Sequence, residues 1–439
     1  MELPETGRDD DAILAEMAAL RDDDADWRAG RTWSLVYHLD DEHKQFKDEA
    51  HALYSTQNAL SPSAFPSLRR FENEIVGMLA DWLGGDEATV GNVTTGGTES
   101  ILLAVKTARD WAREERGVAT PHVVLPETAH PAFSKAAHYF GVEETRVACG
   151  PDWRADPDAM AAAVRDETAL LVASSPSYPH GVVDPVPEIA AIADERDVLC
   201  HVDACIGGIV LASLRDLGRD VPPFDLSVEG VTSLSVDPHK YGYTAKGAST
   251  LLWTDADYRY HQYFAFDDWP GGVYAGPTMA GTRPGGPIAA AWAVLQRLGH
   301  EGYLDLAATT VETAEELMAR ASAIDGLAVV SDPDTTIFAL ESTDPDLDVY
   351  QVHGRMTERG WGLGRQQEPP SIHASVMYHH RNAVDEFVAD LEASVAAARE
   401  SDRTDDLAPM YGTNAEVAAD GDFAELARRR LNETTYRLD

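Results

Sequence analysis

Short apolar runs alternate with segments of helical periodicity through the middle of this chain, and this pattern limits the possible folds more than any other feature. Strand-like runs lie at 122–125, 169–173, 198–202 and 233–236, with helical patterns between them at 133–140 and 187–195. Because parallel strands need a long crossover connection, usually a helix, the alternation predicts a mostly parallel sheet with helices on both faces. A further strand is expected at 251–253, and both a parallel and an antiparallel direction are compatible with its sequence.

The segments on either side of this region are less regular. Apolar residues recur at helical spacing at 12–20, 69–83, 101–113, 288–298 and 303–324. Residues 33–71 are rich in turn signals, and the glycine- and proline-rich segment 271–287 is expected to form an ordered loop. We predict an N-terminal arm (1–60), a large domain (61–300) and a smaller C-terminal domain (301–439).

The charge of the chain is strongly unbalanced. Its net charge of −40 results from 75 acidic residues against 35 lysines and arginines, and only six of these are lysines. Many carboxylates with few lysines suggest a halophilic protein, because concentrated salt shortens the reach of charge repulsion. The acidic residues are spread along the whole chain. Nucleic acid and anionic membrane surfaces are therefore unfavourable partners.

Cysteine usage and hydropathy indicate a protein of the reducing cytoplasm. The three cysteines, at 149, 200 and 205, form no CxxC pair, which argues against a disulfide framework and against a zinc site. The acidic N-terminus lacks the apolar run of a signal peptide. No stretch approaches the ~18 apolar residues of a membrane span, so we expect no membrane partner and no metal.

Two of the six lysines fall in one short segment, residues 233–247. Its alternating polar and apolar residues lead to Asp237 and then to a proline, which lacks a backbone N–H and ends the strand. His239 and Lys240 therefore stand at the carboxyl end of a strand, where α/β folds bind ligands. A lysine there is a candidate Schiff-base nucleophile, although an ordinary surface lysine in a loop would give the same pattern.

A second candidate site begins at Gly96-Gly97-Thr98, just before the helical pattern at 101–113. Backbone N–H groups that the glycines leave accessible, together with the positive end of a helix, form a cradle for an anion such as phosphate. The simpler alternative is an ordinary helix N-cap supplied by Thr95 or Thr98.

Four sets of residues fall at predicted strand ends, in the order Gly96-Gly97-Thr98, His130, Asp203 and His239-Lys240. This set matches the needs of pyridoxal 5′-phosphate (PLP): amides for the phosphate, a flat partner for the ring, a carboxylate for the pyridine nitrogen and an amine for the aldehyde. Taken singly, His130 could be a satisfied loop histidine and Asp203 could cap a turn. Their joint occurrence makes PLP the expected cofactor.

The chain resembles the group II PLP-dependent decarboxylase superfamily of the aspartate-aminotransferase-like fold (fold type I). Within it, the chain is similar to the sphingosine-1-phosphate lyases from about residue 33 onward. The matching motifs are Thr95-Gly96-Gly97-Thr98-Glu99-Ser100, Ala129-His130-Pro131-Ala132-Phe133, Pro179-His180-Gly181-Val182-Val183-Asp184-Pro185, His201-Val202-Asp203-Ala204-Cys205, His239-Lys240-Tyr241-Gly242-Tyr243, Ala280-Gly281-Thr282-Arg283-Pro284-Gly285-Gly286 and Pro369-Pro370-Ser371-Ile372-His373. The resemblance implies a seven-stranded, mostly parallel sheet between helices in the large PLP-binding domain, and a smaller C-terminal α/β domain.

The resemblance also implies roles for residues around the cofactor ring. Lys240 would form the Schiff base, Asp203 would pair with the pyridine nitrogen, and His130 would stack on the ring. Ser174 matches a hydroxyl residue near the ring. Lys246 matches a second lysine of the lyases, for which either proton transfer or binding of a substrate anion is open.

Phosphate contacts are implied for Gly97, Thr98 and His239. Thr282 would reach the phosphate or the site of a neighbouring subunit. The fold implied by the resemblance is that of a homodimer with its active sites at the subunit interface.

Two features depart from the lyase pattern. Where lyases read Asn-Pro-Leu-His, this chain reads Asn58-Ala59-Leu60-Ser61, so Ser61 replaces a histidine expected near the substrate. The text from 224 to 240 is instead similar to archaeal aspartate/tyrosine decarboxylases. We therefore expect a PLP-dependent carbon–carbon lyase acting on a small amine or amino acid, by decarboxylation or by retro-aldol cleavage. A PLP aminotransferase and an inactive scaffold of the same fold are the alternatives.

Overall fold

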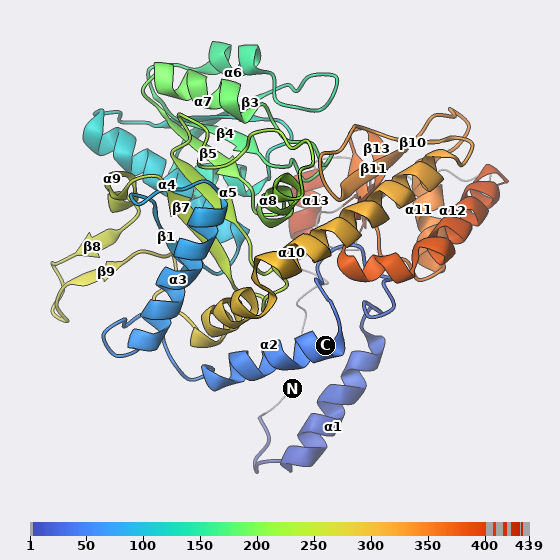
Figure 1. The fold of residues 1–439 in the computed structure, drawn as a ribbon, viewed down its shortest axis with the longest axis horizontal. Coiled ribbons are helices and arrows are strands. Elements are labelled where there is room, and N and C mark those ends of the chain that lie inside the picture. The colour runs from blue at the N-terminus through green and yellow to red at the C-terminus, as the bar shows by residue number, and fades with distance from the viewer. Residues whose placement is uncertain (1–2, 401–406, 410–415, 419–422, 431, 433–439) are drawn as a thin grey trace.

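A computed structural model describes residues 3–400, 407–409, 416–418, 423–430 and 432. Its largest element is a seven-stranded sheet with the strand order β1-β7-β6-β5-β4-β2-β3 (Figure 1). The strands are β1 (Val90–Thr94), β2 (His122–Pro126), β3 (Glu143–Val147), β4 (Thr168–Ser174), β5 (Leu199–Asp203), β6 (Ser233–Val236) and β7 (Ser249–Trp253). Within this sheet β7 is antiparallel to both of its neighbours, and the others run in one direction. The predicted mostly parallel sheet is confirmed.

Helices cover both faces of this sheet because alternate strand residues point to opposite sides. On β4, Leu171 packs toward α3 (Pro66–Trp82), α7 (Val186–Glu195) and α8 (Gly208–Asp216). Its neighbour Leu170 packs toward α4 (Gly97–Glu115) and α5 (Ala132–Phe140). Two shorter helices, α6 (Pro157–Ala163) and α9 (Ala256–Tyr260), complete this part of the molecule. The apolar runs of the sequence are thus continuous because both of their faces are buried.

A second sheet, of four strands, lies beyond the long helix α10 (Gly285–Ser322) (Figure 1). Its order is β10-β11-β13-β12. The remaining elements here are β10 (Leu327–Val329), β11 (Ile337–Ser342), α11 (Val349–Glu358), β12 (Gly364–Gln367), β13 (Pro370–Ser375), η2 (Tyr378–Asn382), α12 (Val384–Arg399), β14 (Leu407–Pro409), β15 (Glu416–Ala418) and α13 (Phe423–Arg430). The domain boundary predicted at residue 300 falls inside α10, beside a kink at Gly299. The other residues predicted in this C-terminal unit, after 400, lie outside the described ranges.

Two connecting segments contain elements that were not expected. The turn-rich segment 33–71 contains α2 (Asp41–Leu53), which the apolar pattern did not reveal because its buried residue is His43. The loop expected at 271–287 contains β9 (Tyr274–Gly276), which pairs with β8 (Phe264–Phe266), and ends where α10 begins.

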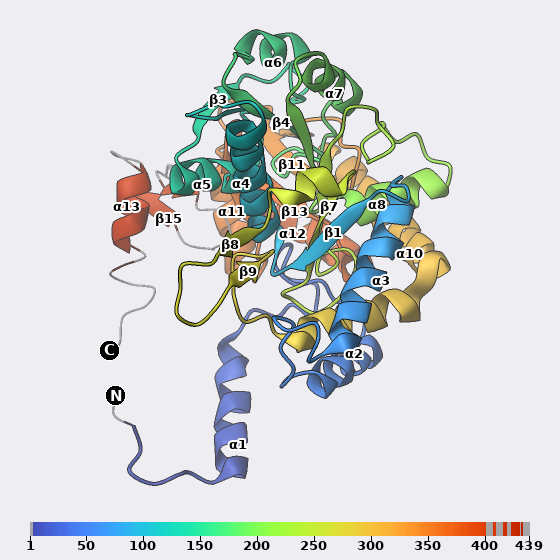
Figure 2. The same ribbon diagram turned by 90° about the vertical axis from the view of Figure 1, so that its left-hand side faces the viewer.

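The first part of the predicted N-terminal arm stands apart from the body of the molecule, whereas Trp33 is buried in the core of the C-terminal unit and α2 packs against α10. Helix α1 (Asp10–Leu20) has no buried residue and projects away from the two sheets (Figure 2). A single turn, η1 (Arg21–Asp23), follows it. None of the helices among the described residues is long and apolar enough to cross a membrane.

A buried ion pair fixes the segment between β9 and α10. The guanidinium of Arg283 donates to both oxygens of Glu72 on α3, at 3.1 and 2.5 Å, and to the carbonyl oxygen of Val93 at 2.8 Å. The N–H of Val93 donates to the same carboxylate at 3.0 Å. This cluster joins α3, β1 and the loop before α10. Because both charges are largely removed from water, each depends on the other.

Replacing Glu72 with Gln should therefore destabilise the protein by about 3 kcal/mol, because the mutation leaves the Arg283 charge buried and unpaired. The measurement is the thermal unfolding midpoint by circular dichroism. The control is Glu316→Gln, which breaks a solvent-exposed pair with Arg320 and should change the midpoint little. Equal midpoints for the two variants would contradict the assigned role.

Candidate active site

A cavity of about 650 Å³ opens at the carboxyl ends of the central parallel strands. Ser174 ends β4, Asp203 ends β5, and Asp237 directly follows β6. All three line the cavity, and the first turn of α4 closes it from another side. Parallel strands bring their carboxyl ends to one edge of a sheet, which is why residues distant in sequence meet here.

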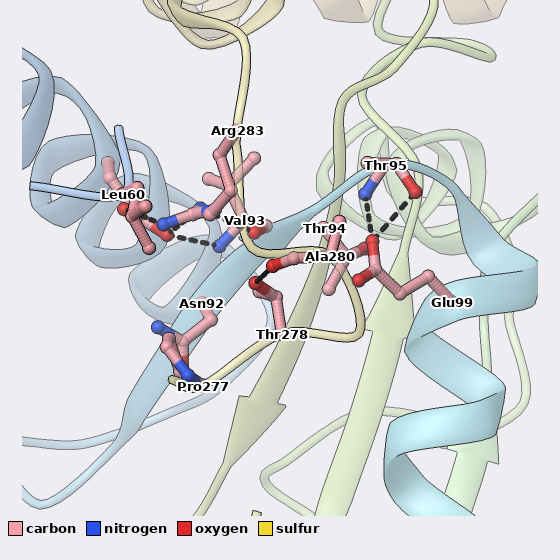
Figure 3. Close-up of polar contacts among 12 residues, drawn as sticks. Leu60, Asn92, Val93, Thr94, Thr95, Glu99, Pro277, Thr278, Ala280 and Arg283 are labelled. Atoms are coloured by element: carbon pink, nitrogen blue, oxygen red, sulfur yellow. Dashed lines mark hydrogen bonds and ion pairs between the residues drawn. The ribbon is translucent and has the colours of Figure 1, made fainter. Parts of the chain in front are cut away.

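The predicted anion cradle forms the start of α4, which begins at Gly97. A Cβ atom at Gly97 would lie 2.7 Å from Cys205 Sγ and 2.9 Å from Asp237 Oδ2, so no larger residue fits. The N–H and hydroxyl of Thr95 both donate to Glu99 Oε2 at 2.7 Å (Figure 3). The other oxygen of Glu99 accepts the N–H of Met279 at 2.8 Å. Glu99 therefore ties the cradle to the loop before α10.

His239 lies beside the cradle. Its ring atom Cε1 is 3.5 Å from the position of a Cβ at Gly96, and its Nδ1 is buried without a hydrogen-bond partner among the described residues. Burial outweighs the nearby carboxylate of Asp237 and lowers the pKa of His239 to about 4. The free imidazole is therefore neutral at pH 7 and keeps one buried nitrogen for a ligand.

Lys240 and Asp237 form a buried ion pair in the turn after β6. The Nζ atom of Lys240 is 3.0 Å from Asp237 Oδ2, and the Asp237 side chain is 1% exposed. Burial opposes the charge of Lys240, but the carboxylates of Asp237 and Asp203 outweigh it and raise the lysine pKa above its ordinary value. For Asp237, burial opposes the charged form, but the positive charge of Lys240 outweighs it and lowers the pKa of the carboxyl.

Asp203 is held at the floor of the cavity by polar contacts. The N–H of Cys205 donates to Asp203 Oδ1 at 3.1 Å, and the Ser235 hydroxyl lies 3.4 Å from the same oxygen. Ser174 is paired with Asp203 in the β4–β5 register, and its Oγ is buried without a hydrogen-bond partner among the described residues. A rigid carboxylate at a strand end is well suited to hold a cationic ring nitrogen.

His130 enters the cavity from the segment between β2 and α5. Its Nδ1 accepts the backbone N–H of Ala132 at 3.1 Å, which fixes the plane of the ring. Burial lowers the pKa of His130, against the attraction of Asp203. The imidazole is therefore a neutral, flat group on the wall of the cavity.

Three predicted or suspected site residues lie outside the cavity of this single chain. Lys246 is exposed, with its Nζ 3.5 Å from the carbonyl oxygen of His239 and 4.8 Å from the ring centre of Tyr37. Thr282 is exposed in the loop before α10, so a contact with this chain's own cradle is not seen; its reach into a neighbouring subunit stays a prediction. Ser61 is half-buried next to Ser63.

The pKa of Lys246 is lowered to about 8. The neighbouring protein atoms remove part of the hydration of its ammonium group, and the positive charge of Lys240 adds to the effect.

Sequence reasoning gave no site role to several residues that line the cavity, among them Asp237 and Glu99. Asp237 was visible three positions before Lys240 but was interpreted only as the end of a strand. Glu99 follows the cradle directly and lines the cavity. No cluster of three or more histidine, cysteine or carboxylate side chains suited to a metal occurs among the described residues.

The residues present fit PLP. The glycines of the cradle, the Nδ1 atom of His239 and the hydroxyl of Ser174 offer contacts that the described part of the chain leaves unused. Asp203 and His130 would hold and orient the ring, and Lys240 would carry the cofactor. When bound, PLP supplies an electron-withdrawing ring that stabilises the electron pair left by a bond broken at the substrate Cα.

Comparison with known proteins agrees with this assignment. Residues 49–340 match the family model described as the pyridoxal-dependent decarboxylase conserved domain. The chain is 39% identical to sphingosine-1-phosphate lyase of Arabidopsis thaliana, over 94% of this chain and 77% of that protein. It is 31% identical to a probable L-tyrosine/L-aspartate decarboxylase of Methanothermobacter thermautotrophicus, over 73% of this chain and 86% of the relative.

Solved structures of a lyase and of a decarboxylase are also similar to this chain. A sphingosine-1-phosphate lyase of Burkholderia pseudomallei superposes with a TM-score of 0.87 at 42% identity, over 91% of this chain and 93% of the other. A glutamate decarboxylase of Lactobacillus brevis, at 19% identity and a TM-score of 0.80, shares the fold over 92% of this chain and 96% of its own. The chain therefore belongs to the pyridoxal-dependent decarboxylase family and is a PLP-dependent carbon–carbon lyase.

Proposed function

We propose that this lyase cleaves the Cα–Cβ bond of a phosphorylated long-chain amino alcohol, releasing a long-chain aldehyde and phosphorylated ethanolamine. The observation that carries the proposal is Lys246, an exposed cation beside His239, in a chain whose net charge is −40. A lysine near a PLP site that has no carboxylate within ion-pair distance in the described structure is suited to a substrate phosphate.

The walls of the cavity support an apolar substrate. Four apolar side chains line it: Ile101 and Leu102 of α4, Ile206 just before α8, and Met279 of the loop before α10. An amino-acid substrate would need few such contacts, whereas a hydrocarbon chain gains about 25 cal/mol for each Å² that it buries. The sphingosine-1-phosphate lyases among the relatives point to the same substrate class.

Different residues would bind the substrate, hold the cofactor ring and transfer the proton. Lys246 would bind the phosphate, and the apolar wall would hold the hydrocarbon chain, so that the bond to the hydroxylated carbon is presented for cleavage. The carboxylate of Asp203 would pair with the nitrogen of the cofactor ring. Lys240, which lines the cavity and would carry the cofactor, would also hold or give a proton during turnover.

Amino-acid decarboxylation is the second candidate. Ser61 stands where the lyases carry a histidine, and one relative is a probable L-tyrosine/L-aspartate decarboxylase. Loss of that histidine would weaken recognition of a phosphorylated substrate, although Lys246 is kept.

Purified protein supplied with PLP should release aldehyde from a phosphorylated sphingoid base, measured with a hydrazine trap, and little CO₂ from aspartate, glutamate or tyrosine. The Lys240→Ala variant should lose both the visible absorbance of lysine-bound PLP and turnover. It therefore gives the background signal of the aldehyde and CO₂ assays. Release of CO₂ without aldehyde would transfer the assignment to decarboxylation. Turnover of neither substrate class would refute the proposal.

The second test uses the pKa of Lys246. A charged Lys246 is needed to bind the phosphate, so kcat/KM should fall as the pH rises through about 8, where the ammonium loses its proton. Lys246→Arg keeps the charge at higher pH and should remove this fall. Lys246→Met should raise KM more than it lowers kcat. A fall that persists unchanged in the arginine variant would exclude Lys246 as its source.

We also propose that the protein works as a homodimer in a salt-rich cytoplasm. The β8–β9 hairpin stands out from the body (Figure 1). It exposes Phe264 (55%), Phe266 (46%), Trp269 (55%) and Val273 (74%). Such a group of exposed apolar side chains is typical of an interface. Met279, just after the hairpin, lines the cavity, which supports a site at the subunit boundary.

Phe266→Asp should accordingly shift the protein from dimer to monomer in light scattering after gel filtration in 2–3 M KCl, where surface charges are screened within about 3 Å. It should also retain less PLP. Leu217→Asp, an equally apolar exposed position at the end of α8, serves as the control and should stay dimeric. A wild-type monomer that is fully active would contradict the dimer.

A further inference from the structure

The carboxylate of Asp237 contacts both residues that follow the proline after β6. Its Oδ2 atom is 3.0 Å from Lys240 Nζ and 3.5 Å from His239 Nε2. The same oxygen lies 2.9 Å from the position of a Cβ at Gly97, in the first turn of the cradle. One atom therefore joins the amine that would carry PLP, the imidazole beside the phosphate cradle and the cradle itself.

This carboxylate has little freedom to move. It is 1% exposed, its backbone N–H donates to the carbonyl oxygen of Cys205 at 3.2 Å, and Gly97 lies directly above it. The titratable groups that face it and its two partners from the surrounding elements are Cys205, Asp203, His130 and Lys246. The thiol pKa of Cys205 is raised well above its ordinary value by burial, so this residue stays neutral.

Without an anion in the cradle, the proton shared by this cluster therefore lies on Lys240, where it prevents the amine from attacking an aldehyde. Lys240 is charged and His239 is neutral, for the reasons given above. An amine attacks an aldehyde only in its neutral form. A phosphate dianion in the cradle, by contrast, favours a protonated imidazole next to it.

We propose that Asp237 couples anion binding in the cradle to activation of Lys240, by passing the lysine proton to His239 when a phosphate group arrives. The proton leaves Nζ, crosses the shared Oδ2 and ends on Nε2. Lys240 becomes the neutral amine that can attack the aldehyde carbon, whose oxygen leaves as water. His239 becomes a cation whose Nδ1–H, buried and without a hydrogen-bond partner in the described part of the chain, donates to the phosphate.

This inference concerns capture of the cofactor and does not depend on which substrate the enzyme cleaves. Asp237 is a positioning residue in it, because it acts through Lys240 and His239. It explains why a carboxylate is tolerated beneath an anion cradle, where its charge alone would repel phosphate. In either position of the proton, one of its two partners, Lys240 Nζ at 3.0 Å or His239 Nε2 at 3.5 Å, is a cation that offsets that charge.

The test uses the full-length protein after removal of PLP, with inorganic phosphate as the probe. Lys240 is labelled with a small amine-reactive reagent at pH 7, and the labelling rate is read by mass spectrometry relative to the exposed Lys135 of α5. Phosphate should accelerate labelling of Lys240 by about tenfold or more, the factor that corresponds to one pKa unit. It should leave Lys135 unchanged.

Two variants make the test specific to Asp237. In Asp237→Asn the amine is no longer held charged, so labelling should be fast with or without phosphate. In His239→Gln the proton has no acceptor, so labelling should stay slow in both conditions. Circular dichroism checks that each variant is folded; if the asparagine variant is not, Asp237→Ser replaces it and the glutamine variant still tests the coupling.

A second readout follows capture of pyridoxal, which lacks the phosphate, by its visible absorbance. Added inorganic phosphate should speed capture in the wild type and have no effect in either variant. A wild type whose Lys240 labelling and pyridoxal capture both ignore phosphate would overturn the proposal. So would an asparagine variant that still responds to phosphate as the wild type does.

Discussion

Contact between the first turn of α4 and the buried carboxylate of Asp237 sets the geometry of this active site. A Cβ at Gly97 would come within 2.9 Å of that carboxylate and 2.7 Å of Cys205 Sγ, so the helix can approach only because the residue is glycine. The approach brings the positive end of α4 over the turn that carries His239 and Lys240. Cradle, imidazole and amine thus form one unit, and a displacement of any element would separate them.

The rest of the fold serves to hold that unit in place. Parallel strands β4, β5 and β6 deliver Ser174, Asp203 and Asp237 to a common edge. The pair of Arg283 with Glu72 holds the loop before α10 against β1, and Glu99 holds the same loop against the cradle. In a chain with a net charge of −40, the lysines at 240 and 246 stand out as local positive charge near this edge. Phosphate groups are therefore attracted to a small part of an otherwise repulsive surface.

Much of the fold could be predicted from the sequence because buried parallel strands leave continuous apolar runs. The strands at His122–Pro126, Thr168–Ser174 and Leu199–Asp203 carry no polar alternation that could be confused with a loop. Helix α2 escaped prediction because it turns His43 inward in place of apolar residues. The place of Asp237 in the site was not predicted for a related reason. An aspartate before proline at a strand end is an ordinary turn residue, and nothing in the local sequence shows that Gly97 covers it.

The sequence by itself determined the parallel sheet and the cofactor, and it predicted the lysine that would carry it, because each rests on local patterns: apolar runs, glycines before a helix, and charged residues at strand ends. Only the tertiary structure decided that one carboxylate oxygen touches both Lys240 and His239, that Ser174 and His239 keep unused polar atoms, and that Thr282 lies outside the cavity of its own chain. These features depend on distances of about 3 Å between segments far apart in the chain. Hydrogen bonds and close ion pairs are made or lost within a few tenths of an ångström, and sequence spacing cannot resolve such differences.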